Sequence, residues 1–365
     1  MDISSIDNVS KRITHPKRLL GSEAPSRARQ VIRAGDVLVA TTRPNLNAVA
    51  RVSPELDNEI ASTGFCVLRP NENLHSQYLY WYVQATQFVD SLSALVQGAM
   101  YPAVTDKQVR AQTIPLPTLA EQQRIAAAIE ARLCEVERAR AAVQAQRDAA
   151  NALMAAHLRA VFEGDEAQGW SRVALLSVCN RITDGTHQPP KFQSDGIPFL
   201  FVRNIVSGRM DFNVEKYISE ATYGELTRRV KPERGDVLFS AVGSFGVAVV
   251  VDTDRPFSFQ RHIAHIKPDH AQLDSRYLAA YLNAPEGRQQ SEQAALGVAQ
   301  RTVTLKSLSA FKIPLPPLDR QIELANDVYQ YSSIRDTANS KLQHQLDLID
   351  RLPAAILRQA FAGEL

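Results

Sequence analysis

The fold of this chain is decided by residues 118–162, which read TLAEQQRIAAAIEARLCEVERARAAVQAQRDAANALMAAHLRAVF. The stretch follows the prolines of Ile114-Pro115-Leu116-Pro117, contains neither Pro nor Gly, and is rich in residues that favour helices. At about 1.5 Å per residue it predicts a rod roughly 65 Å long. Its apolar residues recur at the spacing of a coiled-coil seam. They are Ile125, Ile129, Leu133, Val136, Val143, Ala150 and Leu153.

A single apolar stripe needs a partner, and the chain supplies one by repeating itself. Ile313-Pro314-Leu315-Pro316 repeats the IPLP sequence of residues 114–117, and Gln321 follows it as Gln122 follows the first copy. Near the ends of the two stretches, LMAAHLR at 153–159 corresponds to LPAAILR at 352–358, and FEG at 162–164 to FAG at 361–363. The second stripe consists of Ala338, Leu342, Leu346, Ile349, Ile356 and Ala360. An internal repeat of this length predicts two similar halves, and Pro353 predicts a kink or a new helix start.

The composition is that of an ordinary globular protein. The 365 residues carry a net charge of +2, so a basic surface would have to come from segregated charge. Cys66, Cys134 and Cys179 lie far apart without a metal-ligand pattern, which favours reduced thiols. The first residues lack the layout of a signal peptide, and no apolar run is long enough to span a membrane. These features predict a cytoplasmic protein without a membrane partner.

The repeat divides the chain into four segments. We expect an α+β domain at 1–117, a long helix at 118–165, a second α+β domain at 166–317 and a second long helix at 318–365. Gly35-Asp36-Val37-Leu38 and Gly235-Asp236-Val237-Leu238 are equivalent turn-and-strand sequences, each followed by another strand and a short helix. The first domain is about thirty residues shorter at its front than the second. We therefore expect either an upstream start or a naturally shortened domain.

These features resemble the specificity subunit of a type I restriction–modification enzyme. The resemblance rests on the two unequal domains, the two helices entered by IPLP, the Gly-Asp-Val-Leu strands and the tail LPAAILRQAFAGEL at 352–365. Residues 183–187, TDGTH, also look like the opening loop of a target-recognition domain. The resemblance covers the whole chain. The short first domain is the departure from the family pattern.

The resemblance implies a fold, a function and partners. Two target-recognition domains would be separated by two long antiparallel coiled-coil helices, with a pseudo-twofold relation between the halves. Each domain would read one half of a bipartite double-stranded DNA target, while the helices space the domains and dock two methyltransferase subunits. Motor-nuclease subunits would join for cleavage. S-adenosylmethionine, ATP and Mg would be bound by those partners, with no cofactor in this chain.

The absence of catalytic motifs also favours a chain that has no catalytic activity of its own. There is no Asn-Pro-Pro-Tyr/Phe methyltransferase motif, no GxGxxG followed by a helix pattern and no GxxxxGK[ST] phosphate loop. His262 and His265 are an odd number of residues apart in a predicted strand. They would face opposite sides, which favours contact with solvent or DNA over a metal site. A non-catalytic recognition subunit is therefore expected. The alternatives are the recognition end of a fused methyltransferase-nuclease and a coiled-coil scaffold that does not bind DNA.

Candidate DNA contacts in the first domain lie next to its repeated strand. Arg can bind guanine and Asn can bind adenine, each with two hydrogen bonds. The predicted base contacts are Thr42, Arg43, Asn45 and Asn47. The predicted phosphate contacts are Lys17, Arg27 and Arg29. The alternative for both sets is a polar surface loop, and the resemblance favours DNA contact for the first.

Candidate contacts in the second domain come from four polar segments. The predicted residues are Thr183, Asp184, Thr186, His187 and Lys191, then Ser240 and Ser244, then Gln260, Arg261 and His262, and finally Arg301 and Thr302. Each segment alone is typical of an ordinary surface loop. Together they supply the mixed donors and acceptors that reading a DNA groove requires.

The charges of the first long helix have two interpretations. Arg and Glu alternate along it, which is typical of a solvated coiled-coil flank with pairs four residues apart. The other interpretation is a docking surface for the methyltransferase subunits.

Overall fold

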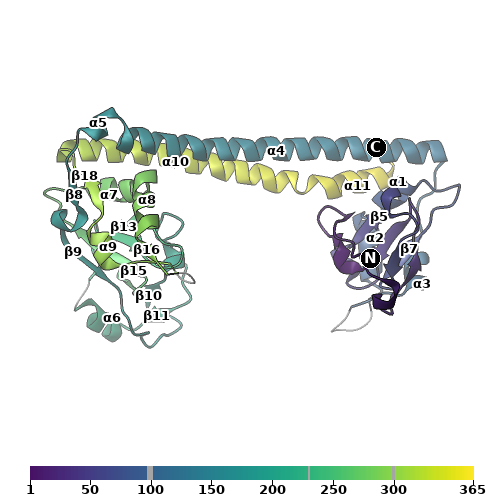
Figure 1. The fold of residues 1–365 in the computed structure, drawn as a ribbon, viewed down its shortest axis with the longest axis horizontal. Helices are drawn as coiled ribbons and strands as arrows, with labels where there is room; N and C mark the ends of the chain where they lie inside the picture. Colours follow the sequence, from purple (N-terminus) through teal and green to yellow (C-terminus); the bar gives the residue numbers. More distant parts are fainter. Residues whose placement is uncertain (97–101, 229–230, 298–300) are drawn as a thin grey trace. The chain divides into compact units, whose positions relative to one another are not determined.

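The structure consists of two units, and each unit contains strands and part of the long helices. The computed structural model describes residues 1–96, 102–228, 231–297 and 301–365. These residues form unit 1, which comprises 1–145 and 342–365, and unit 2, which comprises 146–341. Figure 1 shows strands, short helices and part of the long helices in each unit. The mixed composition of both halves confirms the predicted α+β class.

Unit 1 is built on a three-stranded antiparallel sheet in the order β5-β4-β7. β4 (Val37–Ala40) is buried along its whole length, because its alternate residues face two different apolar clusters. Val37 pairs with Arg51 of β5 (Val49–Arg51) and with Leu68 of β7 (Phe65–Leu68). The other elements are β1 (Ile6–Asp7), β2 (Arg12–Ile13), β3 (Ala28–Val31), β6 (Ile60–Ser62), α1 (Ser76–Tyr82), α2 (Thr86–Ser93) and α3 (Asp106–Arg110).

Unit 2 repeats this sheet and adds a strand, in the order β13-β12-β15-β9. β12 (Val237–Ser240), β13 (Ala248–Val250) and β15 (Ile263–Pro268) correspond to β4, β5 and β7, and β9 (Cys179–Asp184) is the added edge strand. Within the described part of unit 1 no strand takes the place of β9. The other strands are β8 (Arg172–Ala174), β10 (Ile197–Leu200), β11 (Tyr217–Ile218), β14 (Ser258–Phe259), β16 (Ala295–Leu296), β17 (Thr302–Val303) and β18 (Lys312–Pro314). The short helices are α5 (Asp165–Gln168), α6 (Glu220–Thr227), α7 (Ser275–Asn283), α8 (Pro285–Ala294) and α9 (Leu305–Ser309).

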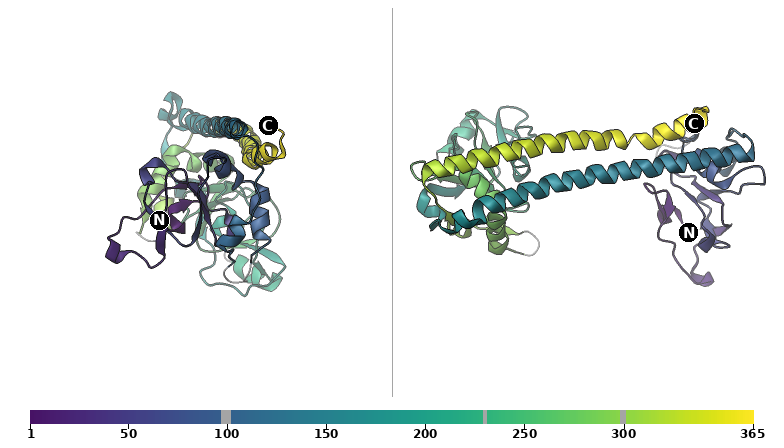
Figure 2. Two further views of the ribbon diagram at one scale, coloured as in Figure 1. Left: turned by 90° about the vertical axis from the view of Figure 1, so that its right-hand side faces the viewer. Right: turned by 90° about the horizontal axis from the view of Figure 1, so that it is seen from above.

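The predicted long helices are present. The first is the uninterrupted α4 (Leu119–Glu163), and the second is α10 (Leu318–Ile349) followed by α11 (Leu352–Ala362). Pro353 lies in the first turn of α11, where its missing N–H costs no helical hydrogen bond. The break before α11 is visible from above in the right-hand view of Figure 2. The prediction that Pro353 starts a new helix is therefore confirmed.

The two long helices pack antiparallel within each unit. In unit 1 the start of α4 meets α11, and in unit 2 the end of α4 meets the start of α10. The buried seam of unit 1 contains Ile125, Ala126, Ile129, Val136, Ile356, Leu357 and Ala360. The buried seam of unit 2 contains Met154, Leu158, Phe162, Leu324, Ala325 and Val328.

One residue of the predicted stripe faces outward. Leu153 is 64% exposed, whereas its neighbour Met154 is buried. Near its end α4 packs on the core of unit 2 as well as on α10, so the buried face advances in four-residue steps through Leu158 to Phe162. These steps shift the seam by one position relative to the seven-residue spacing that the sequence suggested. The assignment of Leu153 to the seam was therefore wrong.

Candidate nucleic-acid interface

The loop after β4 in unit 1 is held at both of its edges. The Thr41 hydroxyl donates to the Gly64 carbonyl at 2.9 Å. The Arg43 N–H donates to the Pro102 carbonyl at 2.7 Å, and the Val104 N–H donates to the Thr41 carbonyl at 2.8 Å. The loop then makes a short 3-10 turn at Pro44–Leu46. These backbone bonds fix residues 41–47 at the end of the sheet.

The fixed backbone presents polar side chains outward. Thr42, Arg43 and Asn45 are exposed, and within the described ranges no hydrogen bond or ion pair of the Arg43 guanidinium is found. Asn47 is half-buried instead, because its amide donates to the Gln84 carbonyl at 3.4 Å and its own carbonyl accepts from Lys11 Nζ at 2.6 Å. Burial lowers the pKa of Lys11, and Asp7 offsets part of that effect. Three of the four predicted side chains are thus available to a ligand, and Asn47 supports the loop.

A second basic segment reaches the same end of the sheet. The Thr63 N–H donates to the Arg27 carbonyl at 2.8 Å, and Thr63 precedes the Gly64 that holds Thr41. Arg27 and Arg29 are exposed, and Arg29 Nε donates to the Ser26 carbonyl at 2.5 Å. Lys17 is also exposed and lies 3.9 Å from Asp2. The structure therefore links the Arg27 segment to the Arg43 loop through one turn, and it leaves Lys17 with a carboxylate neighbour.

Unit 2 repeats the loop connections of unit 1. The Gly243 N–H donates to the Arg301 carbonyl at 3.1 Å, as Arg43 does to Pro102, and Val303 donates to Ala241 at 2.9 Å. The bridge between Thr42 and Ala103 recurs as the bridge between Val242 and Thr302. The hairpin after β12 and the segment at Arg301 and Thr302 therefore form one surface, although nearly sixty residues separate them in the sequence.

The remaining polar segments of unit 2 join the same surface. The Ala241 N–H donates to the His262 carbonyl at 2.9 Å, and the Arg261 N–H donates to the Thr186 carbonyl at 3.0 Å. Gly185 is required at this junction, because a Cβ there would lie 2.1 Å from the Phe259 carbonyl oxygen. Four segments that are separate in the sequence are thus brought together by backbone hydrogen bonds.

The TDGTH loop borders a pocket of about 330 Å³. His187 Nε2 lies 2.8 Å from Asp184 Oδ2, so the carboxylate orients the exposed imidazole. The Thr186 hydroxyl donates to the Gln188 carbonyl at 2.8 Å. The pocket is lined by Asp184, Gly185, Thr186, His187, Gln188, Glu225, Leu226, Ser258 and Phe259. Carboxylate, imidazole and hydroxyl groups beside an aromatic ring suit a ligand with hydrogen-bonding edges and a flat face.

The other predicted residues of unit 2 differ in accessibility. Lys191, Ser244 and Arg261 are exposed, while Gln260, His262 and Thr302 are half-buried. Burial, together with the charge of Arg261, lowers the pKa of His262. Arg301 is already engaged, since it donates to the Glu292 carboxylate at 2.6 Å and lies 5.0 Å over the Phe245 ring.

Three expectations are corrected by burial. Ser240 is fully buried and its hydroxyl accepts the Val247 N–H at 2.8 Å, so it belongs to the hairpin interior. Thr183 is buried in β9, where it pairs with His265. His265 is buried as well, with Nε2 2.6 Å from Asp236 Oδ2, so it contacts neither solvent nor a surface ligand. The Ser240 and Thr183 side chains are therefore not accessible to a surface ligand.

The sequence prediction missed one exposed residue of the first loop. Leu46 is 46% exposed between Asn45 and Asn47. An apolar side chain on a polar loop can contact a thymine methyl group or wedge between bases. The signal that could have identified it is an apolar residue flanked by two amides in a loop.

The described residues offer neither a metal site nor a membrane-spanning helix. No cluster of His, Cys, Asp and Glu there could hold a metal ion. No described helix combines the length and apolar character needed to cross a bilayer.

Comparison with protein families finds a match to the type I restriction modification DNA specificity domain over residues 28–138 and 196–347. The type I restriction enzyme EcoBI specificity subunit of Escherichia coli is 24% identical over 324 residues, which cover 82% of this chain and 68% of that protein. The EcoKI specificity subunit of Escherichia coli strain K12 is 23% identical over 354 residues, which cover 92% and 76%.

Two solved structures resemble this chain along its whole length. The HsdS subunit from Thermoanaerobacter tengcongensis is 32% identical with a TM-score of 0.63, covering 100% of this chain and 90% of that one. A chain from a study of complex assembly and conformational transition in a type I R-M system is 33% identical with a TM-score of 0.83. That match covers 100% of this chain and 91% of the other.

Proposed function

Because this chain belongs to the family of type I restriction–modification DNA specificity subunits, we propose that unit 1 and unit 2 each read one half of a bipartite DNA target. The chain itself is a DNA-sequence specificity subunit, the non-catalytic recognition component of a type I restriction–modification complex. A fused methyltransferase-nuclease and a scaffold without a DNA role are not favoured by these relatives.

One observation carries the proposal. The same backbone connections hold the loop after β4 and the loop after β12, yet the side chains on the two loops are different. Equivalent frames with different polar side chains are what two readers of different half-sites require. Base edges in the major groove differ in their donors and acceptors, so a changed set of side chains changes the sequence that is read.

In unit 1, the base-reading residues of this proposal are Thr42, Arg43 and Asn45. Arg43 is the strongest candidate, because its guanidinium can pair with the two acceptors of a guanine. Leu46 adds an apolar contact beside it. Arg27 and Arg29 are proposed to contact phosphates at the same end of the sheet. Lys17 is proposed to do the same, although the nearby Asp2 carboxylate weakens its attraction for a phosphate.

In unit 2, the corresponding residues surround the junction of the four polar segments. The exposed candidates are His187, Lys191, Ser244 and Arg261, and the half-buried candidates are Asp184, Thr186, Gln260, His262, Arg301 and Thr302. Asp184 acts by orienting His187. Arg301 acts by holding Phe245 in the hairpin, because its guanidinium already has a carboxylate partner.

The decisive experiment compares one variant from each unit by sequencing the methylated motif made with the cognate methyltransferase. Arg43→Ala should weaken discrimination by about 1–3 kcal/mol at one position of one half-site. Arg261→Ala should affect only the other half-site. If either variant relaxes both halves, or if neither changes the motif, the assignment of one half-site to each unit is wrong.

We also propose that the helix pair docks two methyltransferase subunits, which supply S-adenosylmethionine chemistry, and that motor-nuclease subunits with ATP and Mg join them in the cytoplasm. The support is a repeated exposed leucine: Leu153 and Leu352 occupy equivalent positions of the duplication and are 64% and 43% exposed. Two equivalent apolar positions suit two copies of one partner. Leu153→Glu with Leu352→Glu should abolish copurification of the methyltransferase. Gln146→Lys with Gln345→Lys, at exposed and equivalent positions of α4 and α10, should not. Undiminished copurification of the leucine variant would reject this surface.

A further inference from the structure

A glutamine at the start of each long helix is completely buried and fully hydrogen-bonded. In unit 1 the Gln122 amide accepts from the His75 N–H at 2.8 Å and donates to the carbonyls of Asn73 at 2.9 Å and Pro117 at 2.8 Å. These bonds join the first turn of α4 to the loop that precedes α1. Gln122 therefore connects the long helix directly to the globular part of unit 1.

Unit 2 contains the same three bonds. The Gln321 amide accepts from the Asp274 N–H at 2.9 Å and donates to the carbonyls of Gln272 and Pro316, each at 2.9 Å. Gln321 is also completely buried. The same three bonds recur in two units whose loops differ. They therefore belong to the architecture that the two units share, and not to the loops that distinguish them.

The IPLP segments explain why such donors are needed. Proline lacks an N–H but keeps its carbonyl, so a proline-rich segment offers acceptors that its own backbone cannot satisfy. In unit 1 the hydroxyl of Tyr78 donates to Pro115 at 3.0 Å and that of Tyr82 to Thr113 at 2.6 Å. In unit 2 the corresponding bonds run from Tyr277 to Pro314 at 2.9 Å and from Tyr281 to Lys312 at 2.7 Å.

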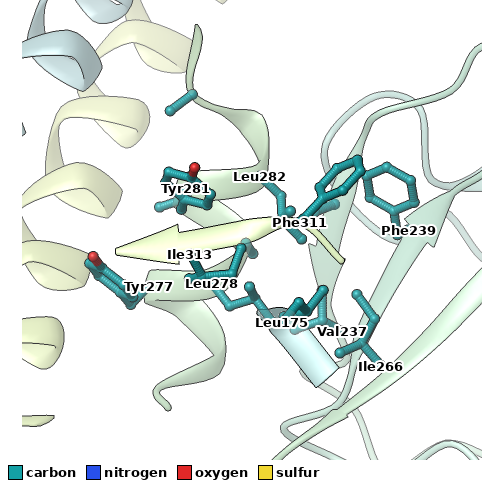
Figure 3. Close-up of a cluster of buried hydrophobic side chains, with 14 of the residues drawn as sticks. Leu175, Val237, Phe239, Ile266, Tyr277, Leu278, Tyr281, Leu282, Phe311 and Ile313 are labelled. Carbon is teal, nitrogen blue, oxygen red and sulfur yellow. The ribbon is translucent and has the colours of Figure 1, made fainter. Parts of the chain in front are cut away.

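The tyrosine rings also contact the helix that ends in the same unit. Phe361 of α11 lies 5.2 Å from Tyr78 and 5.0 Å from Tyr82, measured between ring centroids. Phe162 of α4 lies 5.5 Å from Tyr277 and 5.4 Å from Tyr281. Figure 3 shows Tyr277 and Tyr281 on the side of the core nearest the long helices. We call each set of one Gln, two Tyr and one Phe a clamp.

Each clamp therefore grips both long helices. The clamp of unit 1 holds the start of α4 through Gln122 and the end of α11 through Phe361. The clamp of unit 2 holds the start of α10 through Gln321 and the end of α4 through Phe162. Packing alone would allow an apolar residue at the glutamine position. Three directional bonds in a buried site favour one rotation of the helix relative to the globular part.

We propose that Gln122 and Gln321 are positioning residues that set the number of base pairs allowed between the two half-sites. This inference rests on the proposed function, in which each unit reads one half-site. A domain of about 100 residues has a radius of gyration of about 13 Å. A rotation of about 15° at the clamp moves a loop at that radius by about 3.4 Å, the rise of one base pair along a strand. A loosened clamp would thus admit gaps one base pair shorter or longer.

The test replaces each glutamine by methionine, which has a similar length but forms none of the three bonds. We expect Gln122→Met and Gln321→Met to keep both half-site sequences and to raise methylation of motifs with one base pair more or fewer in the gap at least tenfold relative to the native gap. Gln30→Met is the matched control. Gln30 donates to the Ser62 and Phe65 carbonyls inside unit 1, away from the helix start. Its loss should leave the gap unchanged.

A second pair of variants covers the case in which a methionine variant does not fold. Tyr78→Phe and Tyr277→Phe keep the rings and remove one clamp bond each, so they should widen gap tolerance to a smaller extent. An unchanged gap in folded variants overturns the inference, and so does relaxation of the half-site bases. A wild-type motif that is continuous instead of split would reject the proposed function itself.

Discussion

The two units share a frame and differ in what they place on it. Both have the Gly-Asp turn, the central antiparallel strands, the loop connections and the clamp. Unit 2 adds β9 and the segment containing β10, β11 and α6, and its loop after the central strand carries Gly243 where unit 1 has Arg43. The shared parts are buried or hydrogen-bonded through the backbone. Where the two loops correspond, they differ in exposed side chains, which is the division expected when one architecture serves two specificities.

The same comparison applies to the buried aspartate of the Gly-Asp turn. Asp36 pairs with Arg69, which donates through Nε at 2.9 Å and through a terminal nitrogen at 2.7 Å. Asp236 instead contacts His265 at 2.6 Å and Lys267 at 3.1 Å. Arg69 is half-exposed, whereas His265 is buried. The carboxylate is retained while its side-chain partners change, because the Arg33 and Glu233 N–H groups need the same acceptor in both turns.

The largest expected difference lies in the two clamp phenylalanines. Phe162 is fully buried, so Phe162→Ala should destabilise unit 2 by about 3–5 kcal/mol. Phe361 is half-buried, so Phe361→Ala should cost unit 1 less. Trp81 and Trp170 give each unit its own fluorophore, so denaturant unfolding in Trp81→Phe and Trp170→Phe backgrounds reports the units separately. Equal losses in the two units would show that the clamps are more alike than their burial indicates.

The next difference is in the buried aspartates. Asp236→Asn should destabilise unit 2 by about 1–3 kcal/mol, because it removes the carboxylate that the buried His265 contacts and leaves Lys267 with Glu233 as its remaining acidic partner. Asp36→Asn should cost less, since Arg69 can turn to water. The unfolding of both variants, measured beside the wild type at neutral pH, checks the order. A larger loss for Asp36→Asn would mean that burial of the partner side chain is not the deciding factor.

The Asp236 effect should depend on pH. Burial raises the pKa of Asp236, but hydrogen bonds from His265 and the Glu233 N–H outweigh it, so the pKa lies below its usual value. The stabilisation is therefore present above the unfolded pKa of about 3.9 and is lost as pH falls through the lower folded value. The gap in unfolding free energy between wild type and Asp236→Asn should shrink below about pH 4. A gap that stays constant down to pH 3 would contradict this linkage.

The smallest expected effect concerns the backbone of the two loops. Arg43 has φ 49° and Gly243 has φ 74°, both in the left-handed region that glycine adopts without strain. Arg43→Gly should therefore stabilise unit 1 by up to about 1 kcal/mol while removing the side chain proposed to read a base. Gly243→Arg has open space at its Cβ and should cost unit 2 a similar amount. Thermal unfolding checks both, and a loss of stability in Arg43→Gly would show that the arginine supports the fold.

Much of the architecture was predictable because it depends on the spacing of nearby residues and on the internal repeat. The long helices, the start of α11 at Pro353 and the paired Gly-Asp-Val-Leu strands each depend on short-range patterns. The exposed loops were predictable as polar segments, but their convergence was not, because it depends on backbone bonds between distant residues. The burial of Ser240 and Thr183 has the same cause.

The clamp shows most clearly what could not be predicted from the sequence. The sequence reveals that Gln321 repeats Gln122, but a repeated glutamine near a helix start is ordinary on a solvated surface. Its role follows from partners 47 and 49 residues away in the chain. No periodicity connects such positions. Only the folded backbone brings the proline carbonyls, the tyrosine hydroxyls and the amide together.

The connection of the units by two helices has a consequence for insertions and deletions. Both α4 and the α10–α11 segment pass from one unit to the other, and each end is gripped by a clamp. A change of length in one helix alone would either separate a clamp phenylalanine from its two tyrosines or force the longer helix to bend. Lengthening should therefore be tolerated only when both helices gain matching segments, for instance four residues after Gln146 together with four after Lys341. Under the proposed function, new spacings between half-sites would then arise in discrete, paired steps, whereas new half-site sequences would arise one loop residue at a time.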